Sequence, residues 1–249
     1  MPDRKHILIT GANRGIGKCL LSTYLSRTNH SVIAALRDPA SSSSKELQSL
    51  PRGRDSELIL VKLDSAKEAD ATVAVQYLLS KHNIQKLDVV VANAGISAYF
   101  GKATVTPAKE MYEHFKINTV APLLLFQATA SLLNSAETPR FIVISSSAGS
   151  LSGVKNLPVE NTAYGTSKAG VNFVTRRIHY ENPALIAFSI NPGWLQTDLG
   201  NHAARGIGMA AAPVPVNVGV NGIIEQIDNS TRDRDSGKFL NYDGSEIDW

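Results

Sequence analysis

Mostly apolar residues recur along the chain in seven short runs, each bordered by glycine, proline or polar residues. Runs of this length with such borders are typical of buried β-strands. The sequence therefore predicts strands over residues 6–10, 32–36, 57–63, 87–92, 141–144, 185–190 and 238–240.

Between these runs, apolar residues recur at the three- and four-residue spacing of an amphipathic helix. This spacing predicts helices around residues 20–25, over 66–81 through Val73, Tyr77 and Leu78, over 108–133 and over 218–227. Strands that alternate with helices through a whole chain indicate an α/β fold, with a doubly wound parallel sheet and helices on both faces. No internal repeat or linker interrupts the pattern, so a single domain over residues 1–249 is expected.

Three segments need a separate interpretation. Pro122 should kink or break the long helix, because its ring clashes with the carbonyl four residues earlier, which belongs to Asn118. The serines at 41–44 are expected to cap a helix that begins near Lys45. Residues 194–216 are rich in Gly, Ala and Pro and predict a mobile substrate lid rather than core.

Composition limits the partners and the compartment. The 25 Lys and Arg against 22 Asp and Glu give a net charge of +3, which is too small to indicate a nucleic-acid surface. Cys19 is the single cysteine, so no internal disulfide is possible, and a cytoplasmic protein is expected. The six histidines lack metal-ligand spacing and are expected at surface or loop positions, so no metal is predicted. No export signal or apolar run of about 20 residues is present, and no membrane partner is predicted.

A glycine-rich turn follows the first predicted strand. It reads Gly11-Ala12-Asn13-Arg14-Gly15-Ile16-Gly17 and precedes a predicted helix. Glycines let the backbone turn sharply and approach a ligand, while the N–H groups of a helix start favour an anion such as pyrophosphate. The turn therefore predicts a dinucleotide site, for which a strand–turn–helix context is required.

The ends of the second and third strands concern the adenosine half of such a cofactor. Leu36 holds the position where an acidic residue would accept from a ribose 2′-hydroxyl, and Arg37 follows it. Arg37 and Arg14 together would suit a 2′-phosphate, which favours NADPH over NADH, although both arginines would also be ordinary on a surface beside Asp38. Asp64 either accepts from the adenine amino group or caps the next helix.

The remaining strand ends carry small or hydroxyl side chains. Asn93-Ala94-Gly95 ends the fourth strand, Ser145-Ser146-Ser147 the fifth and Asn191-Pro192-Gly193 the sixth. Farther along, Tyr164 and Lys168 are four residues apart and share a face if that segment is helical. A nearby ammonium lowers the pKa of a phenol and so prepares it for proton transfer, but the same spacing occurs in ordinary half-exposed helices.

With these motifs in order, the chain resembles the short-chain dehydrogenase/reductase family over nearly its whole length. The resemblance rests on five motifs: T-G-x-x-x-G-x-G at 10–17, N-A-G at 93–95, the serine at 146, Y-x-x-x-K at 164–168 and P-G-x-x-x-T at 192–197. Within the family, residues 194–200 and the closing D-G-S-x-x-x-W are similar to fungal norsolorinic-acid-type ketoreductases and to sniffer and C-factor carbonyl reductases.

The resemblance implies a Rossmann-type domain and a catalytic set of Asn118, Ser146, Tyr164 and Lys168. Tyr164 would donate a proton to a carbonyl oxygen, with its pKa lowered by Lys168, and Ser146 would hold that oxygen. Ser147 is the open alternative for the serine. Asn118 would link Lys168 to solvent through water. The implied cofactor contacts are Gly11, Asn13, Arg14, Gly15, Ile16, Gly17, Arg37, Asp64, Asn93, Ala94, Gly95, Tyr164, Lys168, Pro192, Gly193, Leu195 and Thr197.

The sequence thus predicts an NADPH-dependent ketoreductase that acts on a small ketone or aldehyde. Two alternatives stay open: an NAD(H)-dependent alcohol dehydrogenase of the same family, and a non-catalytic nucleotide-sensing module. Tyr99, Phe100, Trp194 and Met209 are candidates to line an apolar substrate pocket. Members of the family are commonly dimers or tetramers, and the apolar run at 123–126 is compatible with such an interface, as it is with core burial.

Overall fold

The structure, a computed structural model, describes residues 4–249. Its centre is a parallel sheet of seven strands in the order β3-β2-β1-β4-β5-β6-β7. The strands are β1 (Lys5–Thr10), β2 (His30–Leu36), β3 (Glu57–Lys62), β4 (Val89–Ala92), β5 (Arg140–Ile144), β6 (Ile186–Asn191) and β7 (Phe239–Asn241). Every predicted strand is present, and the predicted doubly wound α/β fold is confirmed.

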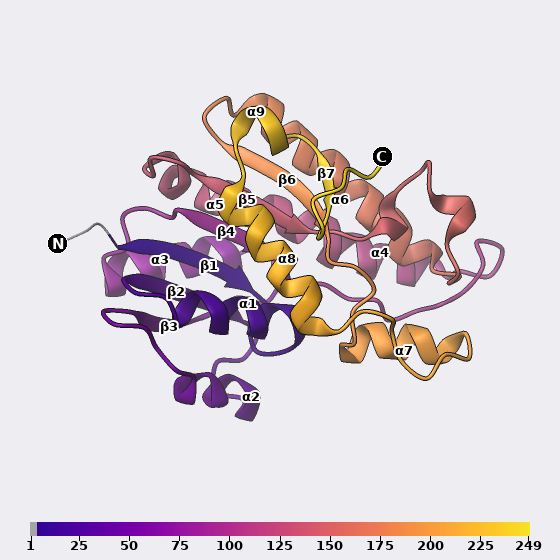
Figure 1. Cartoon of the computed structure of the whole chain (residues 1–249), viewed down its shortest axis with the longest axis horizontal. Helices are drawn as coiled ribbons and strands as arrows, with labels where there is room; N and C mark the ends of the chain where they lie inside the picture. Colours follow the sequence, from indigo (N-terminus) through magenta and orange to yellow (C-terminus); the bar gives the residue numbers. More distant parts are fainter. Residues whose placement is uncertain (1–3) are drawn as a thin grey trace.

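Helices cover both faces of the sheet (Figure 1). Helices α1 (Gly15–Leu25) and α8 (Val216–Asn229) pack on one face, where their apolar side chains join Ile7 and Ile9 of β1 in one core cluster. Helices α3 (Asp70–His82), α5 (Ala121–Asn134) and α6 (Thr162–Glu181) contribute to the cluster on the other face, together with Leu8. Alternate residues of β1 therefore enter opposite cores, as a sheet buried on both faces requires.

The helix predicted over residues 66–81 begins later and buries only part of the predicted face. The chain first turns after Asp64, where Lys67 N–H bonds to the Asp64 carbonyl, and α3 starts at Asp70. Val73 and Tyr77 are exposed, at 56% and 43%. Leu78 is buried as its spacing predicts, and the other buried residues of α3 are Ala71, Ala74 and Val75.

The helix is not broken near Pro122, where the sequence predicts a kink or break, but passes through a π-helical turn. Helix α4 (Ala108–Phe115) continues into the π-turn Lys116–Val120, which leads into α5. Pro122 has no N–H for the carbonyl of Asn118, and the Ala121 N–H reaches back five residues to Lys116. The continuous run Ala108–Asn134 is long and apolar enough to cross a membrane by length and composition alone, but here it packs against α3, α6 and the sheet.

Two further expectations are revised. Ser42–Lys45 themselves form the single helical turn α2, and Ser41 precedes it without a side-chain capping bond. The hydroxyls of Ser41 and Ser44 bond instead to the Asp38 carbonyl, at 2.9 and 2.7 Å, so the serines are not the cap that was predicted. Residues 194–216, expected as a lid without core, contain α7 (Asp198–Gly206) and buried side chains at Leu195, Ala204 and Ala212. The mobility of this segment stays a prediction.

A short helical segment, strand β7 and a folded-back terminus complete the described chain. The segment α9 (Arg232–Asp235) leads into β7. Beyond β7, Glu246 bridges back to Leu240, and Trp249 stacks on Phe239 with ring centroids 5.6 Å apart. The last residues thereby reach the loop after β5, where Ser152 N–H bonds to the Trp249 carbonyl at 3.1 Å.

Candidate active site

Tyr164 and Lys168 lie one turn apart in α6, as their spacing predicts. Lys168 is 5% exposed, and its ammonium donates to the Ile144 carbonyl at the end of β5, at 2.8 Å. The same nitrogen lies 5.6 Å from the centroid of the Tyr164 ring. Burial lowers the pKa of Lys168 to about 8, because the charged form loses its hydration.

The pKa of Tyr164 does not follow the sequence prediction. Burial raises it above its usual range, and a side-chain hydrogen bond with Ser146 opposes that rise without cancelling it. The predicted lowering by Lys168 is wrong for this structure, because the ammonium is directed to the Ile144 carbonyl. A phenol with a raised pKa is protonated at neutral pH, which is the state a proton donor needs.

The three serines after β5 have different surroundings. Ser145 is buried and its hydroxyl donates to Asn172 Oδ1 at 2.6 Å, so it belongs to the core. Ser146 contacts Tyr164, and its Oγ also accepts from the Ala148 N–H at 3.2 Å. Ser147 is exposed and is bound through its backbone, whose N–H donates to Asn191 Oδ1 and whose carbonyl accepts from the Ser150 N–H, both at 3.1 Å. Of the two candidates, Ser146 is the serine that lies against the phenol.

Asn118 lies in the π-turn and forms hydrogen bonds to two neighbouring segments. Its Nδ2 donates to the Ile96 carbonyl and to Ser167 Oγ, both at 2.9 Å, and its Oδ1 accepts from the Ile96 N–H at 2.9 Å. The Ser167 hydroxyl in turn donates to the Tyr164 carbonyl at 2.6 Å. The π-turn is therefore fastened to α6 between Tyr164 and Lys168. Ser167 is a site residue that the sequence reasoning missed, although it directly precedes Lys168.

The glycine turn has a backbone that favours glycine at its three glycine positions. Gly11 and Gly15 adopt left-handed φ values of +64° and +51°. A Cβ at Gly17 would lie 2.4 Å from the Gly11 carbonyl oxygen, so only glycine fits there. The Asn93 amide supports this turn by donating to the Thr10 carbonyl at 2.8 Å. The predicted role of Asn93 in the cofactor site thus includes holding the glycine turn in place.

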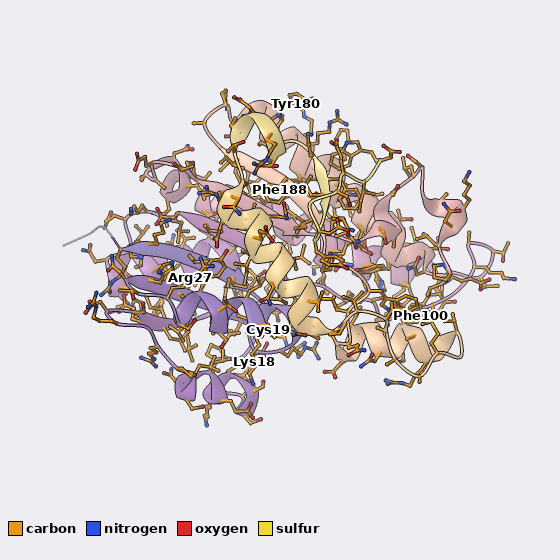
Figure 2. All side chains as sticks on the ribbon, viewed as in Figure 1. Lys18, Cys19, Arg27, Phe100, Tyr180 and Phe188 are labelled. Atoms are coloured by element: carbon orange, nitrogen blue, oxygen red, sulfur yellow. The ribbon has the colours of Figure 1, made fainter. Side chains whose placement is uncertain are left out.

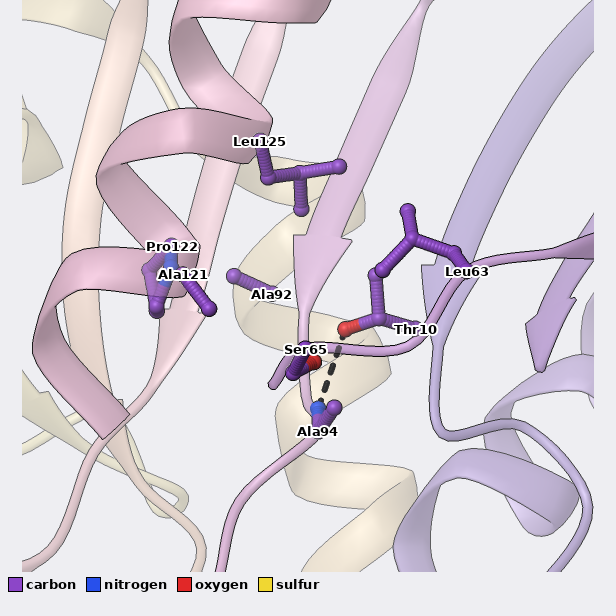
Figure 3. A pocket seen from close by; sticks show the side chains of 8 residues that line it. All are labelled: Thr10, Leu63, Ser65, Ala92, Ala94, Ala121, Pro122 and Leu125. Atoms are coloured by element: carbon purple, nitrogen blue, oxygen red, sulfur yellow. Dashed lines mark hydrogen bonds between the residues drawn. The ribbon is translucent and has the colours of Figure 1, made fainter. Parts of the chain in front are cut away.

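Thr10 was not predicted as a site residue, yet it joins the ends of β1 and β4. Its Oγ1 accepts from the N–H groups of Asn93 and Ala94, both at 3.0 Å. Figure 3 shows the bond to Ala94 at the edge of a cavity of ≈ 10 Å³, at the limit of the space that holds one water molecule. The cavity lies between the ends of β1 and β4 and the start of α5; its lining residues are Thr10, Leu63, Ser65, Ala92, Ala94, Ala121, Pro122 and Leu125.

Arg14 and Arg37 are both exposed, and within residues 4–249 neither guanidinium forms a hydrogen bond or an ion pair. Asp38 Oδ1 accepts from the Ala40 N–H at 2.9 Å and does not neutralise Arg37. The Asp64 carboxylate accepts from the Ala66 N–H at 3.0 Å. Since α3 begins at Asp70, the alternative that Asp64 caps this helix is wrong.

The remaining predicted cofactor residues lie around the glycine turn. Asn13 Nδ2 donates to Ser43 Oγ at 2.9 Å, and a Cβ at Gly15 would lie 3.5 Å from Thr197 Cγ2. Thr197 caps α7 by accepting from the Gly200 N–H at 3.1 Å.

Leu195 is 3% exposed and packs beside Gly219 of α8. Pro192 and Gly193 end β6 at the same edge of the sheet, with Gly193 at φ +83°. Ile16 is partly buried against the core.

A groove of ≈ 270 Å³ opens beside the glycine turn, between the starts of α1 and α7. Lys18 and Cys19, labelled in Figure 2, belong to α1 and line it. Its other lining residues are Gly15, Gln196, Thr197, Asp198 and Val216. Cys19 is half-buried, and burial raises the pKa of its thiol.

The candidate substrate residues lie in the segment after β4 and on either side of α7. Phe100, labelled in Figure 2, lies beside α7, and its ring centroid is 5.5 Å from that of His202. Trp194 Nε1 donates to the Gly200 carbonyl at 2.9 Å and so holds the start of α7. The Tyr99 hydroxyl donates to the Val105 carbonyl at 3.2 Å, and Met209 is 37% exposed. Of these residues, Phe100 connects the segment after β4 with α7.

Comparison with known proteins agrees with this geometry. The sequence profile of the family described as short chain dehydrogenase matches residues 5–208, and the chain belongs to this family. Among its relatives is the norsolorinic acid ketoreductase nor1 of Dothistroma septosporum, 42% identical over 250 residues that cover 99% of this chain and 93% of that protein. The norsolorinic acid ketoreductase stcE of Emericella nidulans is 39% identical over 99% of this chain and 95% of that protein.

Solved structures of carbonyl reductases share the fold. The NADPH-bound carbonyl reductase from chicken fatty liver superposes with a TM-score of 0.87 at 30% identity, covering 99% of this chain and 95% of that chain. The carbonyl reductase Sniffer of D. melanogaster gives a TM-score of 0.84 at 26% identity, covering 99% of this chain and all of that one. The chain is therefore a short-chain dehydrogenase/reductase with ketoreductase relatives, as the sequence motifs indicated.

Proposed function

We propose that this chain is an NADPH-dependent ketoreductase that reduces a ketone or aldehyde, with Tyr164 as the proton donor. The observation that carries the proposal is the position of Ser146 and Lys168 around the half-buried phenol of Tyr164 at the carboxyl edge of the sheet. Its ketoreductase relatives support the reaction class, and the NADPH-bound neighbour supports the cofactor.

The residues present fit a dinucleotide cofactor. Gly11, Gly15 and Gly17 form a turn at the start of α1, and any side chain at Gly95 would approach the Lys168 ammonium to 3.7 Å. Backbone N–H groups of α1 suit the pyrophosphate, and the unpaired Arg14 and Arg37 suit a 2′-phosphate. When bound, the cofactor supplies the hydride.

The side chains of this chain then direct the proton and the charge. The Tyr164 phenol donates its proton to the substrate oxygen as negative charge develops there, and the Ser146 hydroxyl donates a hydrogen bond to the same oxygen. Lys168, held by the Ile144 carbonyl, keeps its ammonium 5.6 Å from the ring centroid of Tyr164, beside the phenol that gives up the proton. Asn118 fixes α6 against the π-turn through Ser167, and so keeps these groups in register.

We include the substrate class, the location and the assembly in the same proposal. Phe100, Trp194 and Met209 around α7 favour an aromatic or other apolar ketone, for which the ketoreductase relatives are a further support. A cytoplasmic location follows from the single cysteine. A homodimer or homotetramer would use the long helices, and size-exclusion chromatography with light scattering measures it.

The test is NADPH consumption with aromatic, aliphatic and β-keto carbonyl compounds, for the wild-type chain and Tyr164→Phe. We expect turnover with at least one class and a loss of about 10²-fold or more in Tyr164→Phe, since general acid catalysis contributes that much. Full turnover in Tyr164→Phe would disprove the role of the phenol. A clear preference for NADH in titrations would favour the alcohol dehydrogenase alternative, and no turnover with any compound would favour the nucleotide-sensing module.

A further inference from the structure

His114 is a buried residue that the proposed chemistry does not use. Within α4, which the structure describes in full, it is the only buried residue, and its side chain is 0% exposed. The sequence pattern predicted surface or loop positions for the histidines, so this placement corrects that prediction for His114. A buried imidazole requires partners for both ring nitrogens, because an unpaired polar group in a protein core is costly.

Both ring nitrogens have a partner. Nε2 lies 3.0 Å from the Ala98 N–H, which can only donate, so Nε2 accepts. Nδ1 lies 2.7 Å from the Glu110 carbonyl oxygen, which can only accept, so Nδ1 carries the hydrogen. These two bonds fix the neutral tautomer with the proton on Nδ1. The Glu110 carboxylate, 3.9 Å from Nδ1, is the charged group beside the ring.

His114 lies in the same helical run as Asn118, and its bond to Ala98 holds the chain segment 96–98. His114 and Asn118 are four residues apart, and Asn118 binds both the N–H and the carbonyl of Ile96. The segment is thus bound at Ile96 by Asn118 and at Ala98 by His114. It begins directly after Gly95, where a Cβ would lie 3.0 Å from Asn118 Oδ1.

Beyond Ala98 the chain continues to Gly101, which is bound to the start of α6. Gly101 N–H bonds to the Glu160 carbonyl at 2.7 Å, and the Thr162 hydroxyl donates to the Gly101 carbonyl at 3.2 Å. Residues 96–101 therefore connect the end of β4, which faces the proposed cofactor, to the helix turn that carries Tyr164. Phe100 within it contacts His202 of α7. A shift of Ala98 would therefore move a segment that is bound both to Asn118 and to the start of α6.

We propose that His114 is a positioning residue: by accepting the Ala98 N–H, it fixes residues 96–101 as one wall of the carbonyl site. The inference rests on the proposed reductase function. The glycine turn of the cofactor site lies on a different segment and has its own support from Asn93 and Thr10. Loss of the His114 bond should therefore weaken use of the carbonyl substrate and leave NADPH binding nearly unchanged.

Three variants test this role. His114→Leu removes both ring nitrogens, so the Ala98 N–H and the Glu110 carbonyl lose their bonds to residue 114. In His114→Gln the amide oxygen reaches about as far as Nε2 and accepts from the Ala98 N–H. Thr129→Val is the matched control, since Thr129 is also buried, lies in the same helical run, and bonds only within α5, to the carbonyls of Leu125 at 2.8 Å and Phe126 at 3.4 Å. His114→Asn, whose shorter amide does not reach Ala98, replaces the Leu variant if that variant fails to fold.

We expect kcat/KM for the carbonyl to fall about tenfold or more in His114→Leu, with most of the loss in KM, because a released amide lets the wall move. The NADPH dissociation constant should change less than about twofold, since the cofactor cradle is untouched. His114→Gln should recover most of the activity, and Thr129→Val should keep it. Equal losses of kcat/KM in His114→Leu and His114→Gln, or losses that only follow a fall in the melting temperature, would show that His114 is simply a core residue.

Hydrogen exchange of the Ala98 amide gives a second measurement that does not depend on catalysis. The amide should exchange faster in His114→Leu than in the wild type, and remain protected in His114→Gln and Thr129→Val. If the wild-type chain reduces no carbonyl compound, the proposed function fails while this exchange pattern still decides whether His114 holds Ala98. Unchanged protection in His114→Leu would overturn the proposal.

Discussion

Lys168 donates a hydrogen bond from its ammonium to the carbonyl oxygen of Ile144 at 2.8 Å. This bond joins the middle of α6 to the last residue of β5, two residues before Ser146. The loop that follows packs directly on the same helix, since a Cβ at Gly149 would lie 2.6 Å from the Lys168 carbonyl carbon. The charged group and the serine of the site are therefore held by one local contact.

The burial of Lys168 predicts a specific dependence of stability on pH. Its pKa is 10.5 when unperturbed and about 8 in the folded chain, so between these pH values the unfolded chain binds more protons. The contribution of Lys168 to the free energy of unfolding should then rise with pH from about 8 toward 10.5, by at most about 1.4 kcal/mol per pH unit. Below pH 8 Lys168 is protonated in both the folded and the unfolded chain, so its contribution to the free energy of unfolding is constant.

Denaturant unfolding of wild type and Lys168→Met between pH 7 and 10 measures this effect. The raised pKa values of Tyr164 and Cys19 lower the free energy of unfolding as the pH rises above the pKa of each group in the unfolded chain. Both groups are present in both proteins. The difference between the two proteins should therefore isolate the rise due to Lys168. Parallel stability curves for the two proteins would show that the Lys168 pKa is not lowered.

The two serines after Ser145 should differ strongly in activity. Ser146 lies against Tyr164, so Ser146→Ala should lower kcat by about 10²- to 10³-fold, as for the loss of one donor to a developing oxyanion. Ser147 is exposed, and its hydrogen bonds are made by its backbone N–H and carbonyl, which alanine retains. Ser147→Ala should keep activity within about twofold. The reverse ranking in steady-state assays would move the carbonyl-binding role to Ser147.

The sequence predicted the sheet because strand runs with alternating helices leave few topologies for a chain of 249 residues. It also predicted Tyr164, Lys168 and the glycine turn, since these depend on residue type at short spacing. The direction of the Tyr164 pKa could not be predicted, because burial outweighs the Ser146 hydrogen bond and the ammonium is bound by Ile144. Burial and competing partners are properties of packing, which spacing does not contain.

Residues that act between segments were missed for a similar reason. Thr10, Ser167 and His114 each join two parts of the chain that are far apart in sequence, as in the bond from Ala98 to His114. The packed face of α3 was predicted only in part, because Leu78 is buried but Val73 and Tyr77 are exposed, while Ala71 and Ala74 are buried. A spacing rule for large apolar residues does not distinguish buried alanines from surface alanines.

The free guanidiniums of Arg14 and Arg37 predict the cofactor preference. Arg37→Ala should raise the dissociation constant of NADPH about tenfold, because a charge-assisted hydrogen bond to phosphate is lost. NADH, which lacks the 2′-phosphate, should bind with nearly the same constant in both proteins. Fluorescence titration with each cofactor measures this difference, and Arg54→Ala, at an exposed arginine paired only with Asp55 at 3.6 Å, is the control. Equal weakening for NADPH and NADH would show that Arg37 does not read the 2′-phosphate.

Two glycines of ordinary backbone conformation provide a matched steric test of the site. A Cβ at Gly95 would lie 3.0 Å from Asn118 Oδ1 and 3.7 Å from Lys168 Nζ, whereas a Cβ at Gly206 would meet nothing within 4 Å. Gly95→Ala should push Asn118 aside and lower kcat/KM by about tenfold, since a group in the constellation moves by a few tenths of an ångström. Gly206→Ala should keep activity and stabilise the chain by about 0.4–1 kcal/mol, because alanine restricts the unfolded state. If Gly95→Ala reduces carbonyl compounds at the wild-type rate while its melting temperature is unchanged, the space around Asn118 and Lys168 is not part of the reacting site.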